Sequence, residues 1–94
     1  MIVTGNVARI LHASKSVGTT ATLLACGTET MDRRTAIYIF NNGLAIIYIG
    51  GSNVTTSNGI PVPPNGDFLI QTGTDLYAVA ASGTVDVRIM EVGG

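Results

Sequence analysis

Apolar runs and turn signals alternate along the whole chain. β-branched and aromatic residues gather in short runs, and Gly, Asn, Asp, Ser and Pro separate them. This pattern is typical of an antiparallel β-sandwich or a jelly-roll-like fold, so it predicts an all-β domain with about seven or eight short strands. The expected strands cover residues 3–13, 20–26, 35–41, 44–49, 67–72, 76–81 and 85–92, with an extended segment at 60–64.

The connections between these runs are polar and glycine-rich. We expect turns at residues 15–18, 65–66, 73–75 and 82–84 because Gly, Asn, Asp and Ser favour turn conformations. Residues 28–34 are expected to form a polar loop or a single helical turn capped by Thr28.

The centre of the chain carries the clearest local signal. Residues 35–41 and 44–49 flank Asn42-Gly43, and both runs are rich in β-branched and aromatic residues. Asn-Gly between such runs favours a two-residue type I′ turn with positive φ at both positions. We therefore expect a β-hairpin. Its first strand should turn Ile37 and Ile39 to one face and Ala36, Tyr38 and Phe40 to the other.

Both strands of this expected hairpin are apolar on nearly every residue. In a single sandwich only one face of a strand meets the core, so the second apolar face needs another cover. The run over 85–92 instead alternates cleanly. Its expected inward residues are Val85, Val87 and Ile89, and its outward ones are Asp86, Arg88 and Met90.

Composition adds to the argument for association. Only 12% of the 94 residues are charged, the net charge is −1 and the mean hydropathy is +0.42. The chain is too apolar for a disordered protein and not basic enough to form the clustered positive surface that nucleic-acid binding needs. Its longest apolar run, Leu44–Ile49, is too short to span a bilayer. A near-neutral surface favours self-association.

The length fits one domain over residues 1–94, with residues 1–6 and 93–94 expected to be flexible. The first residues do not have the basic, then apolar, pattern of a secretory signal peptide.

Few residues are candidates for chemistry. One histidine, His12, and one cysteine, Cys26, could meet as a Cys–His pair, but the simpler interpretation is a strand-end histidine and a small buried thiol. The six acidic residues are scattered beside turns, and no phosphate-binding loop follows a strand. Arg33-Arg34 is the only basic cluster and is expected in a solvated loop. We expect no catalytic, cofactor-binding or metal-binding residues.

The segment Ile60–Pro64 contains three prolines, which exclude it from the middle of a sheet and place it at an edge. A stiff apolar edge segment loses little entropy on docking. The expected assembly interface therefore comprises Tyr38, Phe40, Ile60 and Val62.

The stretches over 48–68 (YIGGSNVTTSNGIPVPPNGDF) and 76–92 (LYAVAASGTVDVRIMEV) resemble small virion-associated proteins of tailed bacteriophages. The resemblance also includes the arginine-containing segment at Arg33-Arg34 and the strand over 37–41. It covers roughly residues 33–92, and the first 30 residues add nothing to it.

This resemblance implies a β-sandwich structural protein of the virion, made in the host bacterial cytoplasm. Its most direct interpretation is a non-enzymatic capsid decoration or cementing protein, which acts as a homo-oligomer, expected to be a trimer. Its partners would be copies of itself and a virion protein such as the major capsid protein, with no nucleic acid and no membrane. The alternative is a tail- or fibre-associated binding module whose loop over 52–59 contacts host carbohydrate or protein.

Overall fold

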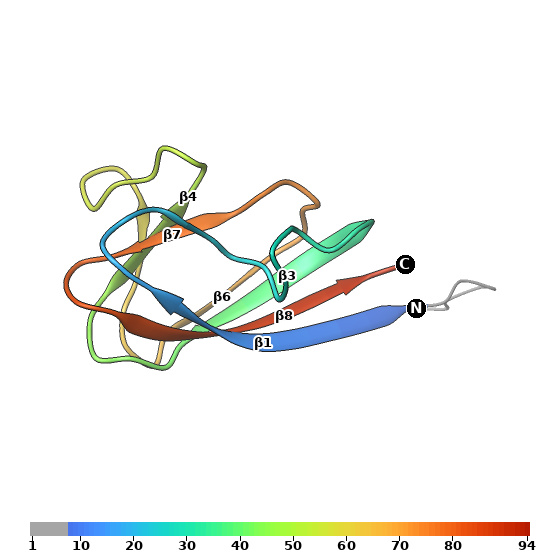
Figure 1. Ribbon diagram of the computed structural model, residues 1–94, viewed down its shortest axis with the longest axis horizontal. Helices are drawn as coiled ribbons and strands as arrows, with labels where there is room; N and C mark the ends of the chain where they lie inside the picture. Colours follow the sequence, from blue (N-terminus) through green and yellow to red (C-terminus); the bar gives the residue numbers. More distant parts are fainter. Residues whose placement is uncertain (1–7) are drawn as a thin grey trace.

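Two four-stranded antiparallel sheets form the part of the chain that the computed structural model describes, residues 8–94 (Figure 1). One sheet has the strand order β1-β8-β3-β6 and the other β2-β7-β4-β5. This confirms the all-β sandwich expected from the alternating runs. The strands are β1 (Arg9–Val17), β2 (Thr22–Leu23), β3 (Arg34–Asn41), β4 (Ile47–Gly50), β5 (Ile60–Val62), β6 (Asp67–Ile70), β7 (Tyr77–Ala80) and β8 (Val85–Gly93).

The strand pairing is that of a jelly roll. The first four strands pair with the last four in reverse order, β1 with β8, β2 with β7, β3 with β6 and β4 with β5. Strands that follow one another in the chain therefore lie in different sheets, except β4 and β5. Figure 1 shows β1 and β8 side by side, with the C-terminus and the start of β1 at the same end of the molecule.

The core lies between the two sheets and follows the alternation expected from the sequence. Ile37 and Ile39 of β3 are buried, and so are Val85, Val87 and Ile89 of β8. The other sheet contributes the inward side chains of β4 and β7, and the connections close the ends. The remaining core members are Val17, Leu24, Ile47, Ile49, Val62, Leu76, Ala78 and Ala80.

The expected hairpin over residues 35–49 is wrong. β3 and β4 belong to different sheets, and neither Asn42 nor Gly43 has a positive φ. Residues 44–46 are not a strand, and β4 begins only at Ile47. The chain here forms an arch that carries it from one sheet to the other.

Asn41 explains why this segment arches. Its buried side-chain amide donates hydrogen bonds to the carbonyls of Ala45 and Val62, both at 2.9 Å. Its Oδ1 accepts a hydrogen bond from the backbone N–H of Gly43 at 2.9 Å. One side chain thus satisfies backbone groups on both sides of the arch, which a two-residue turn could not do.

The ends of several elements also differ from expectation. Residues 15–17 continue β1 instead of turning, because Lys15 to Val17 pair with Val85 to Val87 of β8. The run over 20–26 forms a strand only at Thr22–Leu23, and residues 28–33 form a loop with no helical turn.

The two expected flexible ends have different outcomes. Residues 1–6, and the first part of the strand expected over 3–13, lie outside the described residues. Gly93 is not frayed, because it is buried, pairs with Arg9 and Arg34, and ends β8. A Cβ at this position would lie 3.0 Å from the Arg34 Cα, so only glycine allows the two backbones to approach so closely.

Two of the expected turns contain a residue in the left-handed conformation that Asn and Gly favour. Asn65 has a φ of 65° and Gly83 a φ of 60°.

Within residues 8–94 no helix is long and apolar enough to cross a membrane.

Candidate interaction surface

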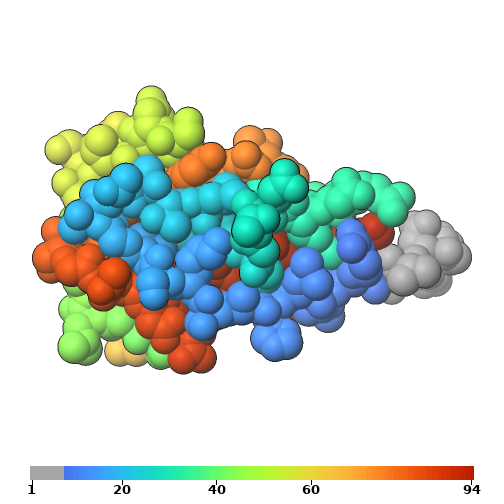
Figure 2. Space-filling view, viewed as in Figure 1, coloured from blue at the N-terminus to red at the C-terminus, as the bar shows by residue number. Residues whose placement is uncertain are grey.

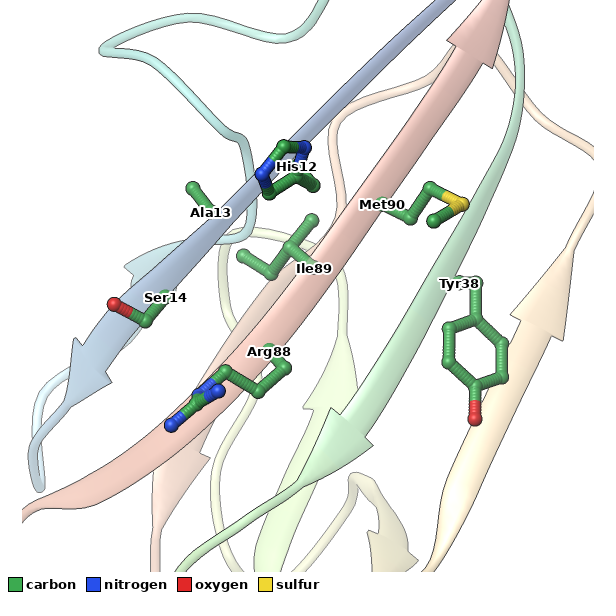
Figure 3. A pocket seen from close by; sticks show the side chains of 7 residues that line it. All are labelled: His12, Ala13, Ser14, Tyr38, Arg88, Ile89 and Met90. Atoms are coloured by element: carbon green, nitrogen blue, oxygen red, sulfur yellow. The ribbon is translucent and has the colours of Figure 1, made fainter.

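The outer face of the β1-β8-β3-β6 sheet carries an unusual number of apolar side chains. Strand register places His12, Met90, Tyr38 and Leu69 in one row that crosses all four strands. Figure 3 shows three of these side chains, His12, Met90 and Tyr38, on neighbouring strands. Because paired residues of an antiparallel sheet share a face, the row forms one continuous surface.

A second row adjoins the first towards the C-terminal end of β8. It consists of Ile10, Val92 and Ala36, again in direct register. Leu69 and Ile10, at opposite margins of the sheet, are 65% and 64% exposed. Met90 and Tyr38 in the middle are 41% and 37% exposed. Isolated exposed apolar residues are ordinary, but a contiguous set across a sheet marks an interaction surface. We call these seven residues, together with Phe40, the outer-face patch.

Polar groups along one side of the outer-face patch are paired with each other. The Tyr38 hydroxyl donates a hydrogen bond to Asp67 at 2.9 Å, and this bond is the main reason that the pKa of Tyr38 is raised. Arg88 and Asp86 form an ion pair at 3.0 Å, and the hydrogen bond from Arg88 lowers the pKa of Asp86. Arg88 and Asp86 therefore neutralise each other, and Asp67 keeps its charge while it accepts the Tyr38 hydrogen bond.

A shallow hollow of about 470 Å³ lies within this surface. It runs between β1 and β3 across β8, as Figure 3 shows. Its wall is largely apolar, and its polar side chains are those of His12, Ser14, Tyr38 and Arg88. Such a hollow fits a protruding side chain of a partner better than it encloses a small molecule.

The outer face of the other sheet is covered in part. Val54, in the connection between β4 and β5, is buried and packs against Gly50 and Gly59. A Cβ at Gly59 would lie 2.7 Å from both the Val54 Cγ2 and the Tyr48 Cβ, so the connection folds tightly back over β4. Within residues 8–94 the two sheets thus differ, since the connection covers part of one outer face, whereas Ile10, Leu69 and Met90 are exposed on the other.

Two polar side chains of this connection accept hydrogen bonds from its own backbone. Asn58 Oδ1 accepts a hydrogen bond from the Thr55 N–H at 2.7 Å, and Thr55 Oγ1 accepts one from the Ser57 N–H at 3.2 Å. These two hydrogen bonds help to hold the loop in its tight fold.

The four residues expected at the assembly interface do not lie together. Tyr38 and Phe40 are on the outer face of β3, as expected. Ile60 lies on β5, an edge strand of the opposite sheet, and is 57% exposed. Val62 is 3% exposed and belongs to the core, so its side chain cannot reach a partner. The edge position of 60–62 is confirmed. Ile60 and Val62 share the inner face of β5, opposite Ile49 and Ile47, but only Val62 is buried there.

Leu69 and Ile10 were not singled out by the sequence. Their exposure depends on strand pairing, which places them beside Tyr38 and Val92. The alternation along Asp67–Ile70 could have predicted the exposure of Leu69. Phe68 and Ile70 pack against the core, so Leu69 between them faces outward.

His12 and Cys26 do not form a pair. His12 lies opposite Met90 on the outer face, whereas the Cys26 backbone N–H donates to Glu91 on the inner side of the same sheet. Burial, more than any other factor, raises the pKa of the Cys26 thiol to about 11. A thiol that stays protonated at neutral pH is a weak nucleophile.

Arg34 is not in a solvated loop. Its guanidinium pairs with the Glu91 carboxylate at 2.9 Å, and both side chains are fully buried. Arg34 also donates to the carbonyls of Thr72 and Thr74, while Glu91 accepts the N–H of Cys26 at 2.8 Å and of Met31 at 3.1 Å. This cluster connects three segments of chain at one end of the sandwich. Figure 2 shows one of them, the connection from β1 to β3, over the middle of the molecule.

Burial by itself would raise the pKa of Glu91. The hydrogen bonds from the amides of Cys26 and Met31 and from Arg34 outweigh burial, so that the pKa lies below its ordinary value. Every polar atom of the cluster therefore has a partner, and its role is to hold the fold.

Among residues 8–94, no group of three or more His, Cys, Asp or Glu side chains is placed to hold a metal ion. Comparison of the chain with protein-family models, curated proteins and solved structures found no match.

Proposed function

We propose that this chain is a non-enzymatic structural component of a tailed-phage virion and that it decorates the capsid as an oligomer. The observation that carries this proposal is the outer-face patch. Among residues 8–94 it is a broad surface with exposed apolar side chains, whereas the β4–β5 connection packs over part of the outer face of the other sheet.

The energetics of this surface favour a packing role. Burying one exposed Leu or Met side chain is worth ~1.5–3 kcal/mol. The patch presents Ile10, Leu69 and Met90 on a rigid four-stranded sheet, so contact with a partner costs little conformational entropy. The local pairing of Arg88 with Asp86 leaves few charges to desolvate.

The virion part of the proposal rests on the resemblance of residues 33–92 to small virion-associated phage proteins. The chemistry of the chain agrees with it. The lone histidine and the lone cysteine lie on opposite sides of a sheet, and the buried Arg34–Glu91 pair is fully occupied with structural hydrogen bonds.

The location can be tested with purified virions separated into heads and tails. We expect mass spectrometry to find this chain in the head fraction. Its recovery from tails alone would replace the proposal with the tail- or fibre-associated binding module, and its absence from virions would overturn both.

The surface can be tested with two matched substitutions. Leu69→Asp places a charge in the outer-face patch, and Ile60→Asp places one at a similarly exposed apolar position on the other sheet. We expect Leu69→Asp to lose incorporation into particles and Ile60→Asp to keep it, with both variants folded by circular dichroism. The reverse result would move the contact to β5.

A further inference from the structure

Within the part of the chain that the structure describes, the edge of β1 that faces away from β8 is a second unpartnered feature of the same sheet. β1 pairs with β8 along its whole length, from Arg9 opposite Gly93 to Val17 opposite Val85, without a bulge. On its other side, no backbone hydrogen bond joins β1 to any other part of residues 8–94. About half of the residues of a strand in this position point their N–H and C=O groups away from the sheet.

The other three sheet edges are short or blocked. β5 contains Pro61, which cannot donate a hydrogen bond. β2 has 2 residues and β6 has 4. β1 has 9 residues and contains neither Pro nor Gly. A long, regular and unpaired edge is a template for another strand.

The two cationic side chains of β1 are not placed to prevent another strand from pairing with this edge. Natural edge strands often carry Lys or Arg to prevent pairing. Here the Arg9 guanidinium donates to the carbonyl of Asp32 at 2.8 Å, and the Lys15 ammonium donates to that of Gly27 at 3.2 Å. Both side chains are therefore bound to the loop that precedes β3, and residues Arg9 to Ser16 are exposed or half-buried.

We propose that β1 pairs with the β1 strand of a second copy of this chain, antiparallel, across a two-fold axis at Ala13. The proposal deepens the proposed function by naming how the oligomer forms. It rests on that function only for the choice of a second copy as the partner.

The sequence of β1 fits this register. With the axis at Ala13, all 9 residues of the strand take part, and the smallest side chain of the strand lies on the axis, opposite itself. Lys15 then faces Leu11 of the second copy, so no like charges oppose each other. Moving the axis to His12 would set Arg9 against Lys15 and one histidine against the other, which is unfavourable.

The pairing also extends the outer-face patch. A two-fold axis perpendicular to the sheet keeps both outer faces on the same side, so two four-stranded sheets become one continuous eight-stranded sheet. Ile10 lies at the margin that is joined, and the two patches would meet along it. An isologous contact of this kind closes at two copies and predicts a dimer in place of the expected trimer.

Hydrogen exchange of the full chain, measured at several protein concentrations, tests the pairing directly. In the monomer the β1 amides that face away from β8 exchange freely. We expect them to become protected as the concentration rises, while sedimentation shows a species of about twice the 9.7 kDa of one chain.

A pair of matched double variants tests the location. Ser14→Lys with Ser16→Lys adds charge to exposed positions on β1, and Ser52→Lys with Thr56→Lys adds the same charge to exposed positions in the β4–β5 connection. In the proposed register position 14 lies diagonally across the axis from position 14 of the second copy, so we expect the first variant to weaken dimerisation about twofold to fivefold through like-charge repulsion. The second variant should leave dimerisation unchanged. Circular dichroism checks that both are folded.

Three results would overturn the inference. Association without concentration-dependent protection of β1 would assign the contact to another surface and leave the proposed function standing. Protection of β1 in a monomer at every concentration would mean that another part of the same chain covers the edge. A monomer with unprotected β1 at every concentration would exclude the pairing. Absence of the chain from virions would instead overturn only the proposed function.

Discussion

Arg34 reaches Glu91 because β3 contains one extra residue between Arg34 and Ala36. β3 pairs with β8 in regular register from Asn41 to Ala36, and the register then shifts before Arg34. Without this shift, Arg34 would share the outer face with Ala36 and Tyr38, because side chains alternate along a strand. The bulge turns Arg34 inward, where its guanidinium lies 2.9 Å from the Glu91 carboxylate.

This buried pair gives the first prediction. Arg34→Met leaves the Glu91 charge buried without its counter-ion, and we expect the free energy of unfolding to fall by ~3–5 kcal/mol. Glu91→Leu should cost a similar amount, since it also removes the acceptor for two backbone amides. Urea unfolding of both single variants and the double variant measures the coupling. A double variant as destabilised as the sum of the singles would contradict a direct interaction.

Stability should depend on pH through the same carboxylate. The folded pKa of Glu91 lies below its ordinary value of 4.5. Its contribution to stability is therefore fully present above pH 4.5 and is lost as the pH falls through the folded pKa. We expect the free energy of unfolding to decline in acid, and to decline less steeply in Glu91→Gln. An equal slope in the variant would assign the acid sensitivity to other carboxylates.

The Cys26 thiol should be slow to react in the folded protein. Its pKa is raised from 9.0 to about 11, first by burial and then by its contact with Glu91. A rise of two units corresponds to a roughly hundredfold smaller thiolate fraction near neutral pH. Alkylation by iodoacetamide, followed by mass spectrometry, should be slow in buffer and fast in urea. Equal rates in the two conditions would show that the thiol is not protected by the fold.

Gly43 should tolerate no side chain, although the cause is not the positive φ that its sequence suggested. A Cβ at this position would lie 2.7 Å from the Val85 Cγ1 and 3.2 Å from the Val85 Cα. We expect Gly43→Ala to lower the free energy of unfolding by ~1–3 kcal/mol. Gly27→Ala is the control, because a Cβ there meets nothing within 4 Å. Thermal unfolding of both variants should separate them, and equal midpoints would place Gly43 away from Val85.

Ile60 and Val62 should respond differently to the same substitution. They lie two residues apart on β5, yet Ile60 is exposed and Val62 belongs to the core. Ile60→Asp should leave the circular dichroism spectrum unchanged. Val62→Asp buries an unpaired carboxylate and should unfold the domain. A folded Val62→Asp variant would mean that the β5 edge can detach from the core.

Local sequence pattern determined the strand content and the two faces of the long strands. The alternation in residues 85–92 identified the inward side chains correctly. The alternation in residues 36–40 divided the side chains correctly between two faces, because the period-2 geometry of a strand depends only on the strand itself. Turns at Asn65 and Gly83 followed from residues that accept positive φ. The prolines at 61–64 correctly predicted that this segment lies at a sheet edge, because a proline has no N–H to donate to a neighbouring strand.

Tertiary structure decided which strands pair and what the polar residues do. Asn42-Gly43 carried a strong hairpin signal, but Asn41 bonds to Ala45 and to Val62, which is 21 residues away, and the chain arches to the other sheet instead. The outer-face patch, the free edge of β1 and the Arg34–Glu91 pair likewise depend on contacts between segments far apart in the sequence. Pairing energy of this kind is summed over the assembled sheets, so no single run of residues contains it.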